Sequence, residues 1–365
     1  MATPRRVVFQ DGLEKDFPKM IPKHCEVCRK TDSLMRCSGC SVYYYCTRDH
    51  QAHDWPTHKP TCKQISAKRK DVQAEEDKIR ARGGLLPWDD PNVNGVFWRH
   101  AHLRPYLQAK FLYGEFLVRS WRRQGVEDSL KEYLDILRRN RPDNQGARDS
   151  VPGLSIRLGQ DQEAYDLIYW WGRKTTQKGF DWADLSQPFL DDKNVDATGP
   201  VDFWCPCFLQ LTPVVALYLI KFRLLQNLKG IKRLRETTPP GSPTPTREEI
   251  LSVLKDKYQC VGNTIDHQPV VDFYHNESLL AEKTNHLLQQ MTQLYHSADN
   301  YNKHMWRLIT DPTEEAFSAL PAPYTPGSWN EAQIVFAHLY SAWAESVAAV
   351  PALRKVIGNA KAATA

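Results

Sequence analysis

The sequence predicts a mainly α-helical protein that carries a small segment rich in cysteine and histidine near its N-terminus. Six of the nine cysteines fall within residues 25–62, about a tenth of the 365-residue chain. From Phe97 onward, apolar residues recur near the 3.6-residue period of a helix. Apolar residues make up 41% and charged residues 25% of the chain, which is ordinary for a globular protein, and the length allows two or three domains.

The cysteine-rich segment contains eight potential metal ligands in four closely spaced pairs. A gap of two or three residues lets both side chains of a pair reach one ion from a tight turn or one helical turn. Thiolates and imidazoles, four to an ion, are the ligands of tetrahedral structural zinc, so two closed zinc sites are predicted. The spacing leaves open whether neighbouring or alternate pairs share an ion. The pairs are Cys25-x2-Cys28, Cys37-x2-Cys40, Cys46-x3-His50 and His58-x3-Cys62.

This segment resembles a MYND zinc finger. The resemblance rests on the two Cys-x2-Cys knuckles, Tyr45-Cys46, Gln51, Asp54-Trp55, His58-Lys59 and Cys62. It implies interleaved sites, with one zinc ion on Cys25, Cys28, Cys46 and His50 and the other on Cys37, Cys40, His58 and Cys62. The family usually has cysteine at the position of His50, and histidine is an ordinary zinc ligand, so we expect the first site to be of the Cys3His type.

The same resemblance implies a partner surface on the finger. In peptide-binding MYND fingers, a short segment containing proline and leucine docks in a shallow groove beside the hairpin. The corresponding groove positions here are Ser38, Gln51 and Trp55. Gln51 and Trp55 are four residues apart, so they project from one side of a helix. The alternative is that Trp55 is simply the core residue of the finger.

Local patterns predict how the finger folds. Leu34 to Cys37 and Val42 to Cys46 are expected to form a small hairpin around Ser38-Gly39. Thr47 is a suitable N-cap for a short helix that ends near Asp54, and Pro56 then begins a second helix. The spare histidines, His24 and His53, are expected in solvent and not on a metal ion.

The rest of the chain is predicted to be helical. The phrases from Arg138 to Arg148 and from Leu158 to Ala164 resemble tetratricopeptide-like repeats, which implies stacked helix pairs. The apolar run from Phe208 to Ile220 is too short and too interrupted to span a bilayer, so we expect a buried helix there. The expected helices are His100–Trp121, Glu127–Arg139, Ala147–Leu158, Gln160–Trp171, 207–230, 247–264, Glu277–Asn302, Thr313–Ala319 and 329–348.

Composition shifts divide the chain into six parts. The stretch from Arg235 to Arg247, rich in proline, serine and threonine, is the clearest linker, and its three Ser/Thr-Pro steps are candidate phosphorylation sites. Thr246 with Glu249 predicts a capping box after it. The tail after Gly358 is expected to fray. The predicted parts are an arm at 1–24, the finger at 25–62, a connecting helix at 63–84, a tetratricopeptide-like helical domain at 85–234, the linker at 235–246, and a further helical part of the same scaffold at 247–358.

The three cysteines outside the finger carry no metal prediction. Cys205-x-Cys207 lies in an apolar turn with no other ligand types nearby in the sequence, and Cys260 falls within the predicted 247–264 helix. All three are expected to be buried thiols.

The distribution of basic residues indicates nucleic-acid binding as one alternative function. Residues 1–82 hold 17 Lys and Arg against 11 Asp and Glu, whereas the whole chain has a net charge of +5. The basic excess therefore lies on the finger and its flanks, where it permits contact with nucleic acid or an acidic partner. Tyr43, Tyr44 and Tyr45 would supply a stacking surface for bases, unless they pack the core of the finger.

Catalysis is the other alternative. Some proteins with a MYND finger are SET-type protein lysine methyltransferases, but their first strands and Gly-x-Gly loop precede the finger. Here Gly12 is the only glycine before Cys25, the Asn-His-Ser/Cys phrase is absent, and the body is predicted helical. No P-loop, HExxH, GxSxG or GxGxxG phrase occurs. We therefore expect a non-enzymatic interaction protein in the nucleus or cytoplasm, without a membrane span, and the resemblance implies a role in transcriptional regulation.

Overall fold

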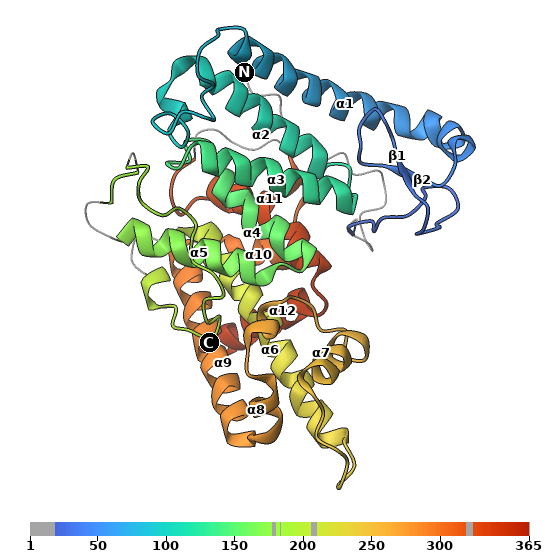
Figure 1. The fold of residues 1–365 in the computed structure, drawn as a ribbon. Coiled ribbons are helices and arrows are strands. Elements are labelled where there is room, and N and C mark those ends of the chain that lie inside the picture. Colours follow the sequence, from blue (N-terminus) through green and yellow to red (C-terminus); the bar gives the residue numbers. More distant parts are fainter. Residues whose placement is uncertain (1–18, 177–179, 183, 206–209, 319–323, 365) are drawn as a thin grey trace. The chain divides into compact units, whose positions relative to one another are not determined.

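The computed structural model describes residues 19–176, 180–182, 184–205, 210–318 and 324–364. The arm predicted at 1–24 and Cys207 therefore lie partly or wholly outside the described residues. The described chain forms two compact units. We call residues 19–154 with 180–189 the N-terminal unit, and residues 155–176 with 190–364 the C-terminal unit. The predicted mainly helical fold with a small finger is confirmed (Figure 1).

The N-terminal unit begins with the predicted hairpin. Strands β1 (Met35–Arg36) and β2 (Tyr44–Tyr45) pair antiparallel, with Met35 opposite Tyr45 and Arg36 opposite Tyr44. The outer edge of β2 is occupied, because the backbone N–H of Glu26 donates to Tyr44 O at 3.0 Å. Among the residues that the structure describes, β2 is paired on its outer edge and β1 is an edge strand.

A single long helix, α1 (Arg48–Arg80), follows the hairpin. The prediction of two short helices divided at Pro56, with a separate connecting helix at 63–84, is wrong, because Pro56 and Pro60 both lie inside α1. Each proline removes one backbone donor, and the carbonyl four residues earlier loses its partner. His58 and Cys62, four residues apart, lie on one face of α1 and belong to the same group of potential metal ligands.

Helices α2 (Arg104–Val118) and α3 (Arg123–Arg139) form the rest of the N-terminal core. They pack against each other, and α2 also packs against α1. Buried Lys110 on α2 joins the pair, because its Nζ lies 2.5 Å from Glu132 and 3.0 Å from Asp135 on α3. Burial alone would lower the pKa of Lys110, but the two carboxylates outweigh it and raise the pKa above the ordinary value.

The finger shares its core with α2. Leu117 of α2 is fully buried among Val42, Tyr45 and Ile65, and Tyr113 and Phe116 pack against the same cluster. Apolar contact therefore joins the finger to α2 within the N-terminal unit. About 40 residues cannot bury enough apolar surface for an independent core, so this contact adds to what the metal sites supply.

The turn before α4 (Ala147–Leu158) explains the Arg138–Arg148 phrase. Asp143 accepts hydrogen bonds from the backbone N–H groups of Ala147 at 2.9 Å and Arg148 at 3.0 Å, which caps the start of α4. Asn140 Oδ1 accepts from the N–H of Trp98 at 3.1 Å. Asn140 and Asp143 of this phrase are thus local turn and cap residues. Helix α5 (Asp161–Thr176) follows.

Helix α6 (Leu211–Thr237) is the central element of the C-terminal unit, as its apolar sequence predicts. It is buried on nearly all sides and contacts α5, α7, α8, α9, α11 and α12. Its buried Lys221 Nζ donates to three oxygens, Ala197 O at 3.0 Å, Gly199 O at 3.1 Å and Gln290 Oε1 at 2.7 Å. Burial lowers the pKa of Lys221 to about 7, whereas the three acceptors favour the protonated form.

Most of the remaining predicted helices exist with shifted ends. The helix predicted at Thr313–Ala319 is instead a short 3-10 turn at Glu314–Phe317, and Ala319 lies outside the described residues. The last residues of α6, Arg235–Thr237, were predicted as linker, and α12 extends through the tail predicted to fray. The predicted 247–264 helix ends at Asp256, so Cys260 lies in the loop beyond it. The predicted capping box of Thr246 and Glu249 is confirmed. At the start of α11, the Ser328 side chain accepts a hydrogen bond from the N–H of Glu331. The elements are α7 (Arg247–Asp256), α8 (Val270–His275), α9 (Glu277–Tyr301), α10 (Met305–Thr310), α11 (Trp329–Glu345) and α12 (Ala349–Thr364), with short 3-10 turns at Phe97–Arg99, Ala101–Leu103, Asp202–Trp204, Thr264–His267 and Glu314–Phe317.

Four aromatic side chains form the centre of the C-terminal core. Tyr218 of α6 lies 5.2 Å from Trp306 and 5.7 Å from Trp343 between ring centroids, and Tyr295 stacks on Trp306 at 5.8 Å. Trp306 Nε1 donates to Tyr295 O at 3.0 Å, so the buried indole N–H is satisfied. Among the described helices, none combines the length and apolar character needed to cross a bilayer.

The turn between α2 and α3 gives a test of the N-terminal packing. A Cβ at Gly125 would lie 2.3 Å from both Leu117 O and Ser120 Oγ. We expect Gly125→Ala to lower the free energy of unfolding by about 1–3 kcal/mol, because the two helices must separate. Gly358→Ala is the matched control, since no atom lies within 4 Å of its Cβ position and alanine favours a helix. Urea denaturation followed by circular dichroism would measure both, and a neutral Gly125→Ala would contradict the packing.

Candidate metal centre

The structure brings eight cysteine and histidine side chains into two groups. Within each group, the ligand atoms all lie within 4.8 Å of one another. Each group holds three sulfurs and one imidazole nitrogen, which is the donor set of structural zinc. The groups interleave along the chain. The first cluster is Cys25, Cys28, Cys46 and His50, and the second cluster is Cys37, Cys40, His58 and Cys62.

The distances within the clusters are close to those of tetrahedral zinc, and those of the first cluster are somewhat shorter. With Zn–S near 2.3 Å and Zn–N near 2.0 Å, the edges of a tetrahedron are about 3.5–3.8 Å. The sulfurs of Cys28 and Cys46 are 3.4 Å apart, and those of Cys37 and Cys62 are 3.7 Å apart. His50 presents Nδ1 to the first cluster, 3.1 Å from Cys46 Sγ. The two clusters are suitable for two zinc ions, and four protein ligands for each ion leave no position for a reacting water.

The ligands of the two clusters come from turns around the hairpin and from helix α1. Cys25 and Cys28 lie on a turn before the hairpin, and Cys37 and Cys40 lie in the connection between β1 and β2. Cys46 lies between β2 and α1, and α1 supplies His50, His58 and Cys62. His50 and His58 are eight residues apart in α1, so their positions are separated by about 12 Å along the helix axis. One helix therefore supplies ligands to both clusters. Gly39 in the second turn is required by space, because a Cβ there would lie 2.7 Å from Cys62 Sγ.

The two clusters differ in burial and in acidity. All four residues of the second cluster are buried, whereas Cys28 of the first is exposed. Hydrogen bonding from the Cys40 thiol lowers the pKa of Cys37 to about 3, and the same contact raises the pKa of Cys40 above its ordinary value. Burial opposes ionisation of Cys25, but N–H groups of Cys28 and Cys46 outweigh it and lower its pKa to about 6. Only some of the thiols ionise readily without metal, so zinc binding releases protons and strengthens as pH rises.

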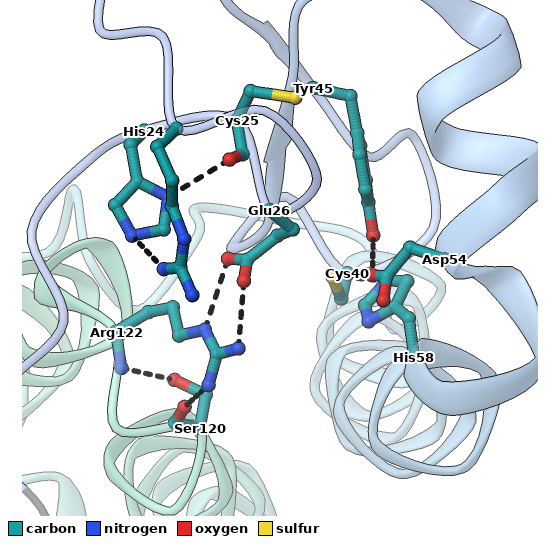
Figure 2. Close-up of polar contacts among 10 residues, drawn as sticks. His24, Cys25, Glu26, Cys40, Tyr45, Asp54, His58, Ser120 and Arg122 are labelled. Atoms are coloured by element: carbon teal, nitrogen blue, oxygen red, sulfur yellow. Dashed lines mark hydrogen bonds and ion pairs between the residues drawn. The ribbon is translucent and has the colours of Figure 1, made fainter.

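His58 is held among aromatic rings. Its Nε2 lies 3.3 Å from Cys37 Sγ, and its ring centroid lies 3.9 Å from that of Tyr43. Tyr43, Tyr44 and Tyr45 are all buried, and the Tyr45 hydroxyl donates to Asp54 at 2.7 Å (Figure 2). These tyrosines pack the finger and its contact with the helices, so they offer no stacking surface to nucleic-acid bases.

The cluster geometry agrees with a comparison of the sequence with protein families. The model of the MYND finger matches residues 25–62. Residues 25–62 are a MYND finger. MYND fingers are zinc-binding modules of protein interaction, not catalytic domains.

The curated proteins similar to this chain share only short segments with it. Egl nine homolog 1 of Mus musculus is 32% identical over 65 residues, and that of Homo sapiens is 45% identical over 40 residues. These segments are 18% and 11% of this chain and 16% and 9% of the relatives. Histone-lysine N-methyltransferase ASHR1 of Arabidopsis thaliana is 36% identical over 47 residues, which are 13% of this chain and 10% of that protein and cover only the finger. No solved structure matches the chain.

A clamp that the sequence did not reveal fixes the finger to the turn between α2 and α3. Arg122 donates to both carboxylate oxygens of Glu26, at 3.0 and 2.9 Å (Figure 2). Its guanidinium lies 4.3 Å from the centroid of the Tyr43 ring. The Tyr44 hydroxyl donates to Gln124 Oε1 at 2.6 Å. Glu26 and Arg122 are 96 residues apart, so no local pattern indicates the pair.

The other predicted residues lie as follows. His24 is buried and outside both clusters, and it bonds to Arg29 at 2.7 Å, so the prediction that it lies in solvent is wrong (Figure 2). His53 is exposed as expected. Cys205 and Cys260 belong to neither of the described clusters, and they are half-buried rather than fully buried as predicted. Burial raises the pKa of both thiols.

The three predicted groove residues all border the second cluster. Ser38 follows the ligand Cys37 and is exposed. The amide of Gln51 donates to Cys37 Sγ at 3.6 Å. Trp55 is 38% exposed, and its ring meets His58 edge-on at 5.9 Å between centroids. Trp55 is thus part of the surface and only partly of the core.

The metal content is the first test of these clusters. Clean protein should contain two zinc ions, and chelation should unfold residues 25–62, because structural zinc contributes on the order of 10–16 kcal/mol to finger peptides. The helical body should keep most of its far-UV signal. His50→Cys should keep both ions, whereas His50→Ala should weaken the first site and leave the second. Metal analysis that finds one zinc or none would exclude the two-site arrangement.

The clamp gives a second test. Arg122→Gln leaves Glu26, 9% exposed, without its charged partner, and we expect a loss of about 1–3 kcal/mol in the stability of the N-terminal unit. The loss should appear as faster zinc release to a chelator. Lys23→Gln breaks the more exposed pair with Glu127 and should cost less than about 1 kcal/mol. Equal zinc release from both variants would show that the clamp does not hold the finger.

Proposed function

We propose that this protein binds short peptide segments containing proline and leucine through its finger, with the helical units as the scaffold. The observation that carries the proposal is the grouping of Ser38, Gln51 and Trp55 around the second cluster, next to an edge strand. The groove would therefore be held in shape by the zinc ion itself. The role is one of binding and not of catalysis, and we extend it to transcriptional regulation on the resemblance alone.

The edge of β1 offers main-chain hydrogen bonds to an extended peptide. Cys37 N donates to Tyr43 O at 2.9 Å, so the next pair, Arg36 with Tyr44, is of the non-hydrogen-bonded kind. The N–H and C=O of Arg36 then point away from β2. An extended segment can pair with them as an added strand, the mode of recognition known as β-augmentation.

Apolar side chains border this edge. Met35 is 47% exposed and lies directly opposite Tyr45, whose hydroxyl reaches α1 at Asp54. Residues directly opposite each other share one face of a sheet, so Met35 lies on the face turned toward α1. Met35 and the half-exposed Trp55 would give a leucine or proline two apolar walls. We propose Met35 as a fourth groove residue.

Gln51 is already oriented for a partner. Its amide N–H points to Cys37 Sγ, which turns the amide oxygen away from the sulfur. That oxygen would accept a backbone N–H of the bound peptide. The contact with a zinc ligand fixes the side chain before binding, so little rotamer entropy is lost when the peptide docks.

Single substitutions separate the groove from the fold. Gln51→Ala should weaken peptide binding about tenfold or more, while zinc content stays at two ions because all eight ligands remain. Gln64→Ala is the matched control, since Gln64 is an exposed glutamine of the same helix. Isothermal titration with a panel of peptides that contain proline and leucine, on the zinc-loaded full chain, would measure both.

The controls decide what a loss of binding means. Trp55→Leu keeps an apolar contact with His58 and should weaken the same peptides while leaving the zinc content unchanged. If Gln51→Ala and Trp55→Leu both bind every peptide as the unsubstituted protein does, the groove is not used. If no peptide of the panel binds the unsubstituted protein, the proposed ligand class is wrong.

A further inference from the structure

The groove continues into a stripe of unpaired cations on α1. Arg48, Lys59, Lys63 and Lys70 are exposed, and together with Trp55 they recur at spacings of seven, four, four and seven residues. Spacings of four and seven residues place side chains on one face of a helix. Lys59 is four residues after Trp55, so the stripe begins at the proposed groove.

Charge along α1 is divided into two blocks. Residues 48–70 hold six Lys or Arg against two acidic residues, Asp49 and Asp54, whereas residues 71–80 hold four acidic residues against two basic ones. Asp54 accepts the Tyr45 hydroxyl, and Lys68 is paired with Asp71 at 2.7 Å. Within the described chain, Arg48, Lys59, Lys63 and Lys70 take part in no ion pair.

The arrangement differs from that of an ordinary solvated helix. In the second block of α1, three acidic residues are paired with cations three or four residues away. These pairs are Lys68 with Asp71, Lys78 with Glu75 and Arg80 with Glu76. The block beside the groove lacks such partners. An excess of one charge on one face attracts ligands of the opposite charge and speeds their association.

We propose that the cation stripe Arg48, Lys59, Lys63 and Lys70 binds an acidic segment of the same peptide that occupies the groove. This inference rests on the proposed function and adds the chemistry of its partner. From Trp55 to Lys70 the helix rises about 22 Å, which is the span of about seven residues of extended chain. The partner is thus an apolar, proline- and leucine-containing core followed or preceded by about seven residues rich in Asp and Glu.

A protein segment fits this surface better than a nucleic acid. Binding of single strands combines a cationic track with exposed aromatic rings on which bases stack. Tyr43, Tyr44 and Tyr45 are buried, and Trp55 is the large aromatic side chain exposed beside the stripe. The surface therefore supplies charge and one apolar anchor, which are the requirements of an acidic peptide.

Two matched peptides test the proposal on the zinc-loaded full chain. Both contain the proline- and leucine-containing sequence that binds tightest in the peptide panel described above. One peptide is extended by seven glutamates and the other by seven glutamines. We expect the glutamate peptide to bind roughly tenfold tighter at low salt, because exposed ion pairs each contribute a few-fold, and the ratio should shrink as salt is added. Equal affinities at low salt would overturn the proposal.

Charge-neutralising variants locate the effect. The triple variant Lys59→Gln, Lys63→Gln, Lys70→Gln should bind both peptides equally, with the affinity of the glutamine peptide unchanged. The control Lys229→Gln, Lys232→Gln, Lys255→Gln removes the same charge from exposed positions on α6 and α7 and should keep the tenfold preference. A preference that survives in the first triple variant, or is lost in the control, would overturn the assignment to this stripe.

The outcomes separate the two proposals. If the glutamine peptide binds and the glutamate extension adds nothing, the groove stands and the cation stripe fails. If no core binds but a heptaglutamate peptide alone binds and the first triple variant abolishes it, the stripe stands and the groove fails. If a twelve-nucleotide thymidine strand binds tighter than the glutamate peptide and the triple variant abolishes that binding, the surface is a nucleic-acid site and the proposal is wrong.

Discussion

Metal coordination at the second cluster is the interaction on which the finger and its contact with α2 depend. It joins Cys37 and Cys40 of the hairpin to His58 and Cys62 of α1, and all four residues are buried. The second cluster borders the apolar core of the finger, because Ile65, three residues after Cys62 on α1, packs with Val42 and Leu117. Metal ligation, hairpin geometry and the contact with α2 therefore form one connected arrangement, and loss of the ion would remove its centre.

Much of this arrangement could be predicted from local sequence, and the remainder could not, for physical reasons. Metal ligands come in close pairs, so the spacing of Cys37 and Cys40 already indicates a site. The pairing of Glu26 with Arg122 depends on two residues far apart in the chain, which no local period marks. The continuity of α1 was missed because Pro56 normally begins or breaks a helix. His58 and Cys62 join this part of α1 to Cys37 and Cys40, a contact with residues outside the helix that a local pattern does not indicate.

The helical body shows the same division between local and distant causes. The burial of α6 followed from its apolar composition, and the cap at Thr246 followed from a three-residue pattern. The ends of helices were less predictable. Helix α7 ends at Asp256 and Cys260 lies in the loop beyond it, where its sulfur reaches Gln226 O at 3.6 Å on α6. Contacts of that kind decide where a helix stops, and they are set by elements elsewhere in the chain.

The clamp of Glu26 and Arg122 has a consequence for whatever the finger holds. Because the finger is fixed to the turn between α2 and α3 by a bidentate ion pair and a shared apolar core, it cannot swing on a tether. A bound segment would leave the protein in one set direction relative to α1, α2 and α3. If the protein that carries this segment makes a second contact with the N-terminal unit, that contact is intramolecular and occurs at a high effective concentration. The direction set by the first contact determines which second contacts are within reach.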